Sequence, residues 1–558
     1  MDNTISVKRS KRKAHNSFVY RFGWVFLSLL GAAFLILSFP TPGISFLAWI
    51  AFVPLFIILM EENFIRALFS SILMGVLFNT VYLFWMKEYK HPASLSGGVF
   101  LEMLFFVSAS LLSRFLYRNV GKSGKNFFLC DVTCFVLGWF ALDYVKTIGF
   151  LAFPWGILGY TQYKNLKLIQ SASLFGLWGV HFVLLYFNAA IACMILSYAK
   201  IMRMKRCGLI LSGNSIIVPI HVIIHISLAS FFLVLSLVYG WLVLEEWRYK
   251  KFPEKKVAAI QGNFDPWSPD LANNIEIEIS LTMEALRYDP DLIIWSESSA
   301  PFPYEFFLNE GNRYARRIHN FISGVGKPFI FGSIEFVGQH KGGKYIGDFY
   351  NVAVYYNEGL FKGTYRKIHL VPFGEWFPYK RLFPFVARIL EKAGAGDFVP
   401  GSDFLIFRGE DFSFSILICF EDVFGNLARK FVLGGSEILI NVTNDAWTGS
   451  KKAEIQHFSK SIFRAIENRR SLIRAANGGI TASISPYGEV LAQLEPFTTS
   501  YLICKVPVVE KEVITFYTKH GDFLPIIIFF FISSLFIFYL IKKILTDLKL
   551  EIRCKSKV

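Results

Sequence analysis

A thiol, an ammonium group and carboxyl groups stand at the ends of apolar, strand-like runs in the second half of the chain. Glu297 ends "LIIWSE", Lys367 and Glu375 lie in "YRKIHLVPFGE", and Cys419 follows "SILI". Polar residues released at the strand ends of an α/β sheet are placed to meet a ligand. A carboxylate can take the thiol proton, and an ammonium group can stabilise the thiolate and a developing oxyanion while sulfur attacks a carbonyl. Because each residue alone is common at a strand end, only their joint occurrence predicts covalent acyl chemistry on Cys419.

Residues 255–510 must form the scaffold that brings these side chains together. Short β-branched runs alternate there with amphipathic, helix-like stretches; the runs include "KVAAIQGN", "PFIFGSIEF", "FYNVAVYY" and "SEILINVTND". Charged residues are frequent in this region, in contrast to the segments on either side. Strands and helices that alternate in this way indicate one soluble α/β domain.

The composition of the whole chain indicates a membrane protein. Of 558 residues, 54% are hydrophobic, 17% are aromatic and only 18% are charged, which is typical of a chain that buries apolar surface in lipid. Lys and Arg (58) exceed Asp and Glu (42), but many basic residues crowd the edges of apolar segments, so the excess predicts membrane topology rather than nucleic-acid binding. The seven cysteines form no CxxC pair and no Cys/His metal spacing. We therefore expect no disulfide framework, no metal and no cofactor.

Apolar segments predict about eight membrane spans. About seven lie within 22–247 and one at 521–543; they are expected near 22–39, 40–60, 67–86, 98–116, 127–145, 174–198, 219–243 and 523–541. The first two form an uncleaved hairpin joined at Pro40–Pro42. The segment near 148–163 is rich in Pro, Gly and aromatic residues, which favours a re-entrant or interfacial segment over a further span.

Basic residues set the expected orientation of these spans. A basic arm at 1–21, basic fourth and sixth loops and a basic tail at 544–558 fall on one side of the membrane if the spans alternate. By the positive-inside rule both termini are then cytoplasmic. The domain at 255–510 is expected on the outer side.

Longer sequence motifs around the strand-end residues resemble those of a known family. They are "YRKIHLVPFGEWFP" (365–378), "ICFED" (418–422), "NVTNDAWTG" (441–449), "QHF…RAIENRRSLIRAANGG" (456–479) and "FPWGILGYTQ" (153–162). With the order Glu297…Lys367…Cys419 they resemble the apolipoprotein N-acyltransferases, a family of the nitrilase (carbon–nitrogen hydrolase) superfamily. The resemblance covers nearly the whole chain. It implies a nitrilase-like α-β-β-α sandwich in a polytopic α-helical protein of the bacterial inner (cytoplasmic) membrane, with the sandwich on the periplasmic side.

The resemblance implies a two-step acyl transfer without a cofactor. Cys419 would attack an acyl ester of a phospholipid and form a thioester. The α-amine of a diacylglyceryl-modified N-terminal cysteine on an apolipoprotein would then take the acyl chain, in the last step of lipoprotein maturation. A thioester stays reactive enough for an amine to attack it, provided that water does not compete.

The resemblance also implies roles for the site residues. Glu297 is the general base and later the acid, Lys367 lies near the thiol and the oxyanion, and Glu375 orients Lys367. Glu421 shapes the active pocket. Trp447 also matches a family position, where it would contact acyl chains. Three further residues match family positions near the site, or act only as hydrogen-bonding residues that lock loops: Asn351, Arg474 and Asn477.

Two residues beside the predicted triad depart from the family's usual pattern. Ser296 stands where the family often has Pro, and Phe420 stands where a Tyr often follows the nucleophile. Any role of that hydroxyl is therefore absent or supplied elsewhere. Asp422 is equally compatible with a site and with simple solubility at a strand end.

Three other functions are compatible with parts of the sequence. A membrane-tethered amidase or nitrilase hydrolase would use the same triad but deliver the acyl group to water, and it would not need so many spans. A transporter with an accessory domain would place polar residues in mid-span; Glu102, Asp131 and Asp143 lie near span ends, where we expect partial solvation. A Cys/His protease would use His369 or His457, which lie in no recognisable signature.

Overall fold

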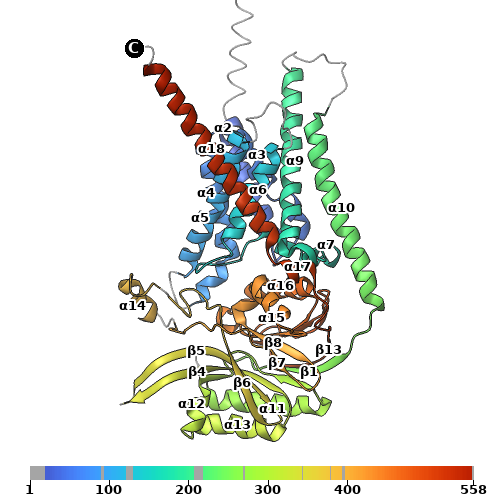
Figure 1. The fold of residues 1–558 in the computed structure, drawn as a ribbon, viewed down its shortest axis with the longest axis vertical. Helices are drawn as coiled ribbons and strands as arrows, with labels where there is room; N and C mark the ends of the chain where they lie inside the picture. The colour runs from blue at the N-terminus through green and yellow to red at the C-terminus, as the bar shows by residue number, and fades with distance from the viewer. Residues whose placement is uncertain are drawn as a thin grey trace, which may run out of the picture.

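Two parts are stacked along the long axis of the molecule, a helical bundle and an α/β body (Figure 1). The computed structural model describes residues 19–89, 94–120, 130–206, 218–267, 270–341, 344–377, 379–392 and 396–555. Most of the predicted basic arm and the last three residues of the predicted tail lie outside the described residues. The first described helix and the C-terminal helix both belong to the bundle.

The bundle is built from apolar helices. They are α2 (Val19–Ser38), α3 (Val53–Glu61), α4 (Phe64–Tyr82), α5 (Ser94–Phe115), α6 (Cys130–Val145), α9 (Leu177–Arg206), α10 (Ile220–Tyr249) and α18 (Phe523–Lys555). Of the described chain, five helices are long and apolar enough to cross a membrane: Phe64–Tyr82, Ser94–Asn119, Leu177–Lys205, Ile220–Tyr249 and Phe523–Leu548. The remaining predicted spans correspond to the shorter apolar helices Phe22–Ser38, Ser45–Glu61 and Val132–Val145. The prediction of about eight spans is therefore confirmed only roughly.

The second predicted span is interrupted for a local reason. A 3₁₀ helix, η1 (Ser45–Trp49), precedes α3, and Pro54 occupies the first turn of α3. Proline is favoured in the first turn of a helix because it lacks the N–H that a preceding turn would need. The stretch from 45 to 61 consequently forms two short helical pieces.

The chain between α6 and α9 folds into short pieces at the junction of the two parts. It contains the 3₁₀ helix η5 (Leu158–Gln162) and the one-turn helices α7 (Leu166–Ile169) and α8 (Ala172–Phe175). Gln162 donates to the carbonyl oxygen of Ser45 in the bundle at 2.8 Å, and Gln170 donates to the carbonyl oxygen of Tyr487 in the body at 2.8 Å. This junction segment therefore connects the bundle to the body.

Acidic residues inside the bundle have polar partners, and Glu102 is also buried. Glu102 is 4% exposed and accepts a hydrogen bond from Lys146 Nζ at 3.1 Å. Asp143 lies 3.0 Å from His181 Nε2 and accepts from the indole of Trp139 at 3.0 Å. The expectation of partial solvation is wrong for Glu102, because the Lys146 ammonium group takes the place of water at its carboxylate. The side chain of Asp143 is 13% exposed, so nothing contradicts the expectation there. The side chain of Asp131 lies outside the described residues.

The body is an α-β-β-α sandwich, as predicted. One sheet has the order β13-β1-β2-β4-β5-β6, with β3 paired to β4, and the other has the order β12-β11-β10-β9-β8-β7. The strands are β1 (Glu254–Gln261), β2 (Leu292–Ile294), β3 (Ala300–Pro303), β4 (Phe329–Lys341), β5 (Lys344–Asn357), β6 (Leu360–Arg366), β7 (Phe407–Arg408), β8 (Ser413–Ile418), β9 (Ile438–Asn444), β10 (Ser471–Asn477), β11 (Ala482–Ile484), β12 (Val490–Gln493) and β13 (Ser500–Pro507).

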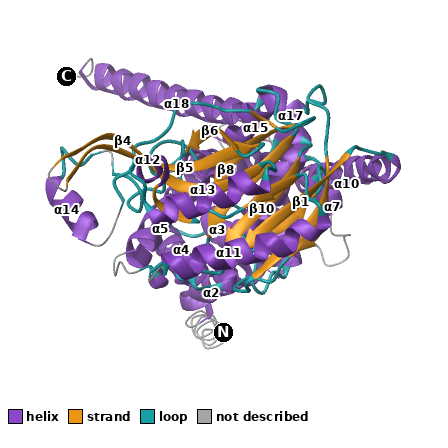
Figure 2. Cartoon of the chain, turned by 90° about the horizontal axis from the view of Figure 1, so that it is seen from below, coloured by secondary structure: helices purple, strands orange, loops and turns teal. Residues whose placement is uncertain are grey.

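Helices cover both outer faces of the sandwich. On the first sheet lie α11 (Leu271–Ala285) and α13 (Arg313–Val325), which cross its strands in Figure 2. On the second sheet lie α15 (Gly425–Leu433) and α16 (Lys451–Asn468), between that sheet and the bundle (Figure 1). The described helices of the body also include α12 (Tyr304–Asn309), α14 (Pro384–Lys392) and α17 (Phe516–His520).

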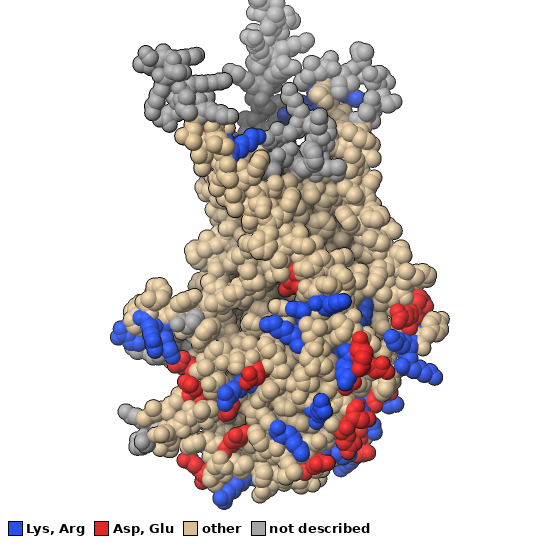
Figure 3. All heavy atoms as spheres, in the orientation of Figure 1, with Lys and Arg blue, Asp and Glu red and all other residues tan. Residues whose placement is uncertain are grey.

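The buried core joins the bundle to the body. One apolar cluster fills the space between the first sheet and its helices. The larger cluster runs from the bundle through α15 and α16 into the space between the two sheets. On the face shown in Figure 3, charged side chains gather on the body, whereas the bundle presents a largely uncharged surface. This distribution is typical of a helical part surrounded by lipid and a body in water.

Candidate active site

Cys419 lies on a strained turn directly after a buried strand. Strand β8 is parallel to β9, and it ends at Ile418, where the 3₁₀ turn η7 (Cys419–Val423) begins. The backbone φ of Cys419 is +51°, in the left-handed region that side chains rarely adopt. Ile418 and Phe420 are buried, but Cys419 is partly exposed. The turn thus holds the thiol at the edge of the sheet, the kind of strain that collects at functional sites.

Glu297 approaches the same edge from the other sheet. It follows β2, is 5% exposed, and accepts hydrogen bonds from the side-chain amide of Asn351 at 2.8 Å and from the backbone N–H of Asn444 at 2.8 Å. Gly332 permits this position, because a Cβ there would lie 2.5 Å from the Cα of Glu297. The carboxylate is therefore fixed by a side chain and a backbone group on two different strands.

Lys367 lies between two carboxylates. Its Nζ is 2.8 Å from Glu375 Oε1 and 3.5 Å from Glu297 Oε1. Asn351 donates to Glu375 at 2.9 Å as well as to Glu297, so it holds the two carboxylates on either side of the ammonium group. Burial opposes the charged form of Lys367, but Glu375 and Glu297 outweigh it and raise its pKa, so Lys367 stays an ammonium group.

The electrostatics of the site keep the resting thiol neutral and the base available. Burial and the Glu297 carboxylate raise the pKa of the Cys419 thiol well above its usual range, and the Lys367 ammonium counteracts them. Burial also raises the pKa of Glu297, while Lys367 lowers it. A carboxylate with a raised pKa is a better proton acceptor, so Glu297 is suited to take the Cys419 proton when a substrate arrives.

Glu421 ties the nucleophile turn to the segment that carries Lys367. Its carboxylate accepts from the backbone N–H groups of Ile368 (2.7 Å), His369 (3.0 Å) and Ile418 (2.7 Å), and from the hydroxyl of Tyr365 (2.9 Å). Burial raises the pKa of Glu421 to about 7 although these backbone donors oppose it. Glu421 is 0% exposed. It therefore positions both Cys419 and Lys367 from behind and does not line a pocket surface.

Glu421→Ala is expected to lower the free energy of unfolding by about 3 kcal/mol, because one buried and two partly buried N–H groups lose their acceptor. Thermal unfolding of the full-length protein in detergent measures the change. Glu410→Ala, at an exposed position, is the control and should leave the midpoint in place. A midpoint equal to that of the control would show that water or another group replaces the Glu421 carboxylate.

A second buried network lies behind the nucleophile turn. Asp422 bonds His457 Nε2 at 2.7 Å and Arg474 at 2.9 Å, and Asp445 bonds His457 Nδ1 at 2.9 Å and also pairs with Arg474. The two aspartates raise the pKa of His457 although burial lowers it. Asp422 is 0% exposed, so its interpretation as a solubility residue is wrong. The network locks η7 onto α16 and β10.

The other predicted site residues lie at different distances from the triad. Asn351 contacts it directly. Asn477 donates to the side chain of Asn444 at 3.0 Å, whose backbone N–H reaches Glu297. Arg474 belongs to the buried network, and Trp447 packs edge-on against Trp267 at 4.8 Å. The roles of these residues toward a substrate stay predictions.

Aromatic residues of the bundle cover the nucleophile turn. Trp155, in the junction segment, stacks on Phe420 at 5.8 Å with an interplanar angle of 16°. Tyr89, which follows α4, lies close enough to Cys419, Asp445 and Glu375 for their charges, together with burial, to raise its pKa. Sequence reasoning missed Tyr89, because no motif connects it to the body. The Tyr89 hydroxyl is a candidate to replace the tyrosine hydroxyl that the family often has at the position of Phe420.

Tyr89→Phe is expected to slow reaction at Cys419 about fivefold, the size of effect expected if the Tyr89 hydroxyl donates one hydrogen bond to the reacting groups. The rate of acyl-enzyme formation, followed by intact mass, measures it, and the unfolding midpoint should not move. Tyr249→Phe, at a position that is 82% exposed, is the matched control. Equal rates for the two variants would remove Tyr89 from the site.

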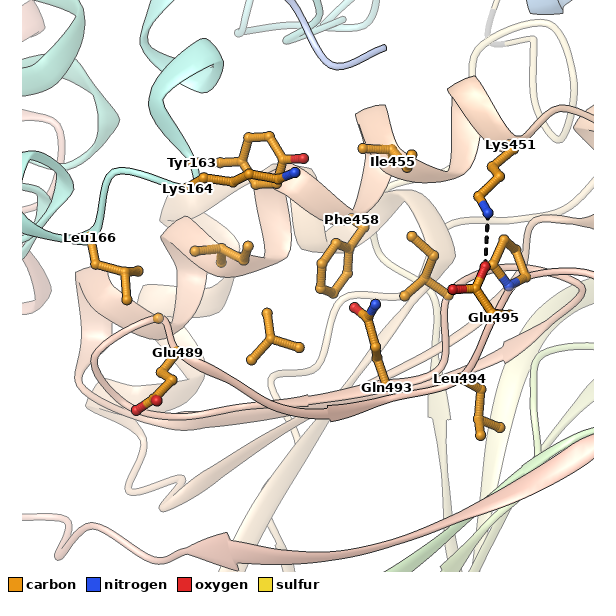
Figure 4. A pocket seen from close by; sticks show the side chains of 15 residues that line it. Tyr163, Lys164, Leu166, Lys451, Ile455, Phe458, Glu489, Gln493, Leu494 and Glu495 are labelled. Carbon is orange, nitrogen blue, oxygen red and sulfur yellow. Dashed lines mark hydrogen bonds and ion pairs between the residues drawn. The ribbon is translucent and has the colours of Figure 1, made fainter. Parts of the chain in front are cut away.

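A cavity of about 330 Å³ lies on the far side of α16 from Cys419. Figure 4 shows it between the junction segment, with Tyr163 and Leu166, and the body, with Phe458 and Leu494; the pair of Lys451 and Glu495, 2.8 Å apart, stands at its rim. None of the predicted site residues lines this cavity. Helix α16 therefore separates it from the acyl chemistry.

Comparison with known proteins first identifies the class of the body. Residues 256–512 match the family model described as carbon–nitrogen hydrolase. A solved amidase from Nesterenkonia sp. is 17% identical, with a TM-score of 0.35, and the match covers 46% of this chain and 92% of that chain. By the family-model match, the α-β-β-α sandwich is a carbon–nitrogen hydrolase domain.

The bundle and the full-length relatives identify the family. Residues 31–190 match the model described as the apolipoprotein N-acyltransferase N-terminal domain. The apolipoprotein N-acyltransferase of Geobacter metallireducens is 33% identical over 89% of this chain and 91% of that protein. Apolipoprotein N-acyltransferase 1 of Treponema denticola is 29% identical over 92% of this chain and 95% of that protein. The chain belongs to the apolipoprotein N-acyltransferase family.

Proposed function

We propose that the protein transfers an acyl chain from a phospholipid, through a thioester on Cys419, to the α-amine of the diacylglyceryl-cysteine of an apolipoprotein. One observation carries the proposal above the others. The turn that holds Cys419 packs, through Phe420, against Trp155 of the junction segment, so the nucleophile faces the membrane-embedded part of the chain. A hydrolase of small soluble amides would gain nothing from that position.

The first half-reaction follows from the geometry of the triad. Glu297 takes the proton of the Cys419 thiol, and the thiolate attacks the ester carbonyl carbon of the phospholipid. The Lys367 ammonium, held by Glu375, stabilises the negative charge that develops on the carbonyl oxygen. When the tetrahedral intermediate collapses, the C–O bond breaks, Glu297 returns its proton to the leaving oxygen, and a lysophospholipid departs. The acyl chain remains on sulfur as a thioester.

The second half-reaction reuses the same groups. Glu297 takes a proton from the attacking amine, the nitrogen adds to the thioester carbonyl, and Lys367 again faces the oxyanion. The C–S bond then breaks, the proton on Glu297 returns to sulfur, and an amide is released. The apolar cover formed by Phe153, Trp155 and Phe420 limits the access of water, which would otherwise hydrolyse the thioester.

An exposed apolar arm beside the site fits a substrate that resides in lipid. Around α14, Leu382 is 72% exposed, Phe383 56% and Phe385 70%. The base of this arm contacts the junction segment, where Phe150 packs edge-on against Trp376 at 5.8 Å. Exposed apolar groups of this kind mark contact with lipid or with a partner. We infer that the arm guides acyl chains between the bilayer and Cys419.

The orientation belongs to the same proposal. We infer that both termini are cytoplasmic and that the body lies in the periplasm, beside the outer leaflet of the inner membrane. The basic residues of the cytoplasmic loops and tail support this arrangement. Apolipoproteins carry their modified cysteine on that side, so the acceptor and the thioester would share one compartment.

The test supplies full-length protein in mixed micelles with a phospholipid carrying a labelled acyl chain and a synthetic diacylglyceryl lipopeptide. We expect labelled triacylated peptide and an equal amount of lysophospholipid. Labelled free fatty acid with no triacylated peptide would contradict the transferase and leave a membrane-tethered hydrolase. An N-acetylated lipopeptide is the matched control and should accept no acyl chain.

A further inference from the structure

Lys460 is a fully buried lysine that has no carboxylate within ion-pair distance in the described part of the chain. It lies on α16, on the face that packs against the nucleophile turn, and is 0% exposed. Its Nζ donates to the carbonyl oxygen of Gln456 at 2.7 Å. The neighbouring Arg464 pairs with Glu467 at 2.8 Å, whereas Lys460 forms no ion pair within the described part of the chain. A buried charge without a counter-ion is costly and calls for another source of stabilisation.

Two aromatic rings of the junction segment supply that stabilisation. Lys460 Nζ lies 3.8 Å from the ring centre of Trp155 and 5.0 Å from that of Tyr160. Both rings are buried, at 4% and 2% exposure. An ammonium group over the face of a desolvated indole is attracted by the ring quadrupole, and this attraction disappears when the amine loses its proton.

Trp155 transmits this contact to the nucleophile. Its indole N–H donates to Gln456 Oε1 at 3.2 Å, and its carbonyl oxygen accepts from Lys146 at 2.6 Å. The ring stacks on Phe420, which directly follows Cys419. Three side chains therefore form one line of contact: Lys460, Trp155 and Phe420.

We propose that Lys460 is a positioning residue for Cys419. As an ammonium group it holds the Trp155 indole against Phe420 and so fixes the turn that presents the thiol; as a neutral amine it releases that hold. The inference rests on the proposed function, because the step that it tunes is formation of the acyl-enzyme. It adds a proton-controlled contact between the bundle and the nucleophile that the triad itself does not contain.

The surroundings of Lys460 lower the pKa of its amine. Burial lowers the pKa of Lys460 well below the usual range of lysine, and the carboxylate of Asp422 in η7 opposes this lowering. Three positive charges lower the pKa further: Arg464 of α16, Lys146 beyond α6 and Arg474 of β10. The Lys460 ammonium is therefore present at lower pH and is lost as pH rises. His457 lies on the same face of α16, one turn earlier, and its bonds to Asp422 and Asp445 hold it in place.

The test compares wild type with Lys460→Met, which is apolar at every pH, and Lys460→Arg, which is charged at every pH. Full-length proteins in detergent are scanned from about pH 5.5 to 9.5, a range below the ordinary pKa of lysine. The first readout is the alkylation rate of Cys419 by iodoacetamide, measured on its peptide. The second readout is the rate of acyl-enzyme formation from a phospholipid.

We expect wild type to follow Lys460→Arg at low pH and Lys460→Met at high pH, with the two variants differing about tenfold in rate. Parallel curves for wild type and Lys460→Met at every pH would overturn the inference. If Lys460→Arg does not fold, the ratio of wild type to Lys460→Met must still fall toward one as pH rises. Absence of a thioester in wild type would contradict the proposed function. Because alkylation needs no acyl donor, the effect of Lys460 on Cys419 could still be interpreted in that case.

Discussion

Cys419→Ser is expected to form no hydroxylamine-labile acyl adduct and to lose N-acyl transfer by a factor of about 10⁴, because a serine hydroxyl at this position ionises far less readily than a thiol. Intact mass after incubation with phospholipid shows the adduct directly. In wild type we expect a single added acyl chain that hydroxylamine removes. In Cys419→Ser we expect the mass of the unmodified chain.

The matched control is Cys504→Ser. Cys504 lies in β13, is 6% exposed, and its thiol faces the carbonyl oxygen of Val257 at 3.9 Å. Serine fits that position and leaves Cys419 untouched, so the control should acylate at the wild-type rate. An acyl adduct of wild-type yield in Cys419→Ser would move the nucleophile to another residue and overturn the proposed chemistry.

Glu297→Gln is expected to lower the rate of acyl-enzyme formation about 10³-fold, because the amide has the shape of the carboxylate but accepts no proton. Lys367 keeps Glu375 as a partner, so the site should stay assembled. Glu278→Gln is the matched control: Glu278 is 0% exposed, against 5% for Glu297, and burial raises its pKa to about 8, so its carboxyl group is mostly neutral at pH 7. A small effect at Glu297 would assign the base elsewhere.

The same pair of variants tests the pH dependence. Glu297 must be ionised to take the thiol proton, and burial raises its pKa above the usual range of glutamate. Acyl-enzyme formation should therefore be slow in acid and rise as pH passes that raised pKa. Glu278→Gln should keep this rise, whereas Glu297→Gln should lack it. Pre-steady-state mass spectrometry across the pH range follows the transition.

The scaffold and the members of the triad could be predicted because their signal is local. Cys419 and Glu297 each follow a short apolar run, and such runs form strands that end in polar residues; in the fold these two strands belong to the two different sheets. The order of layers in the sandwich was predicted from the family resemblance of the longer sequence motifs. The interruption before α3 was missed, because the apolar composition continues through the stretch that Pro54 and a 3₁₀ helix divide.

The hydrogen bonds of the supporting residues could not be predicted, because their partners are distant in the sequence. Glu421 accepts a hydrogen bond from the N–H group of Ile368, 53 positions earlier, and only the folded chain shows that this carboxylate links the two segments. For the same reason the sequence left Asp422 open between a site role and a solvated strand end. Tyr89 and Lys460 depend on how the bundle docks on the body, and a single sequence contains no direct signal for that arrangement.

The hydrogen bonds of Gln456 have a practical consequence for studying the catalytic part alone. Its carboxamide accepts from Trp85 at 3.0 Å and from Trp155, and donates to the carbonyl oxygen of Tyr82 at 3.0 Å, in the middle of the continuous core. Severing the body from the bundle would expose the apolar core around this side of α16 to water and would also remove the partners of Gln456. A water-soluble fragment should therefore aggregate, and inhibitor screening needs the intact membrane protein.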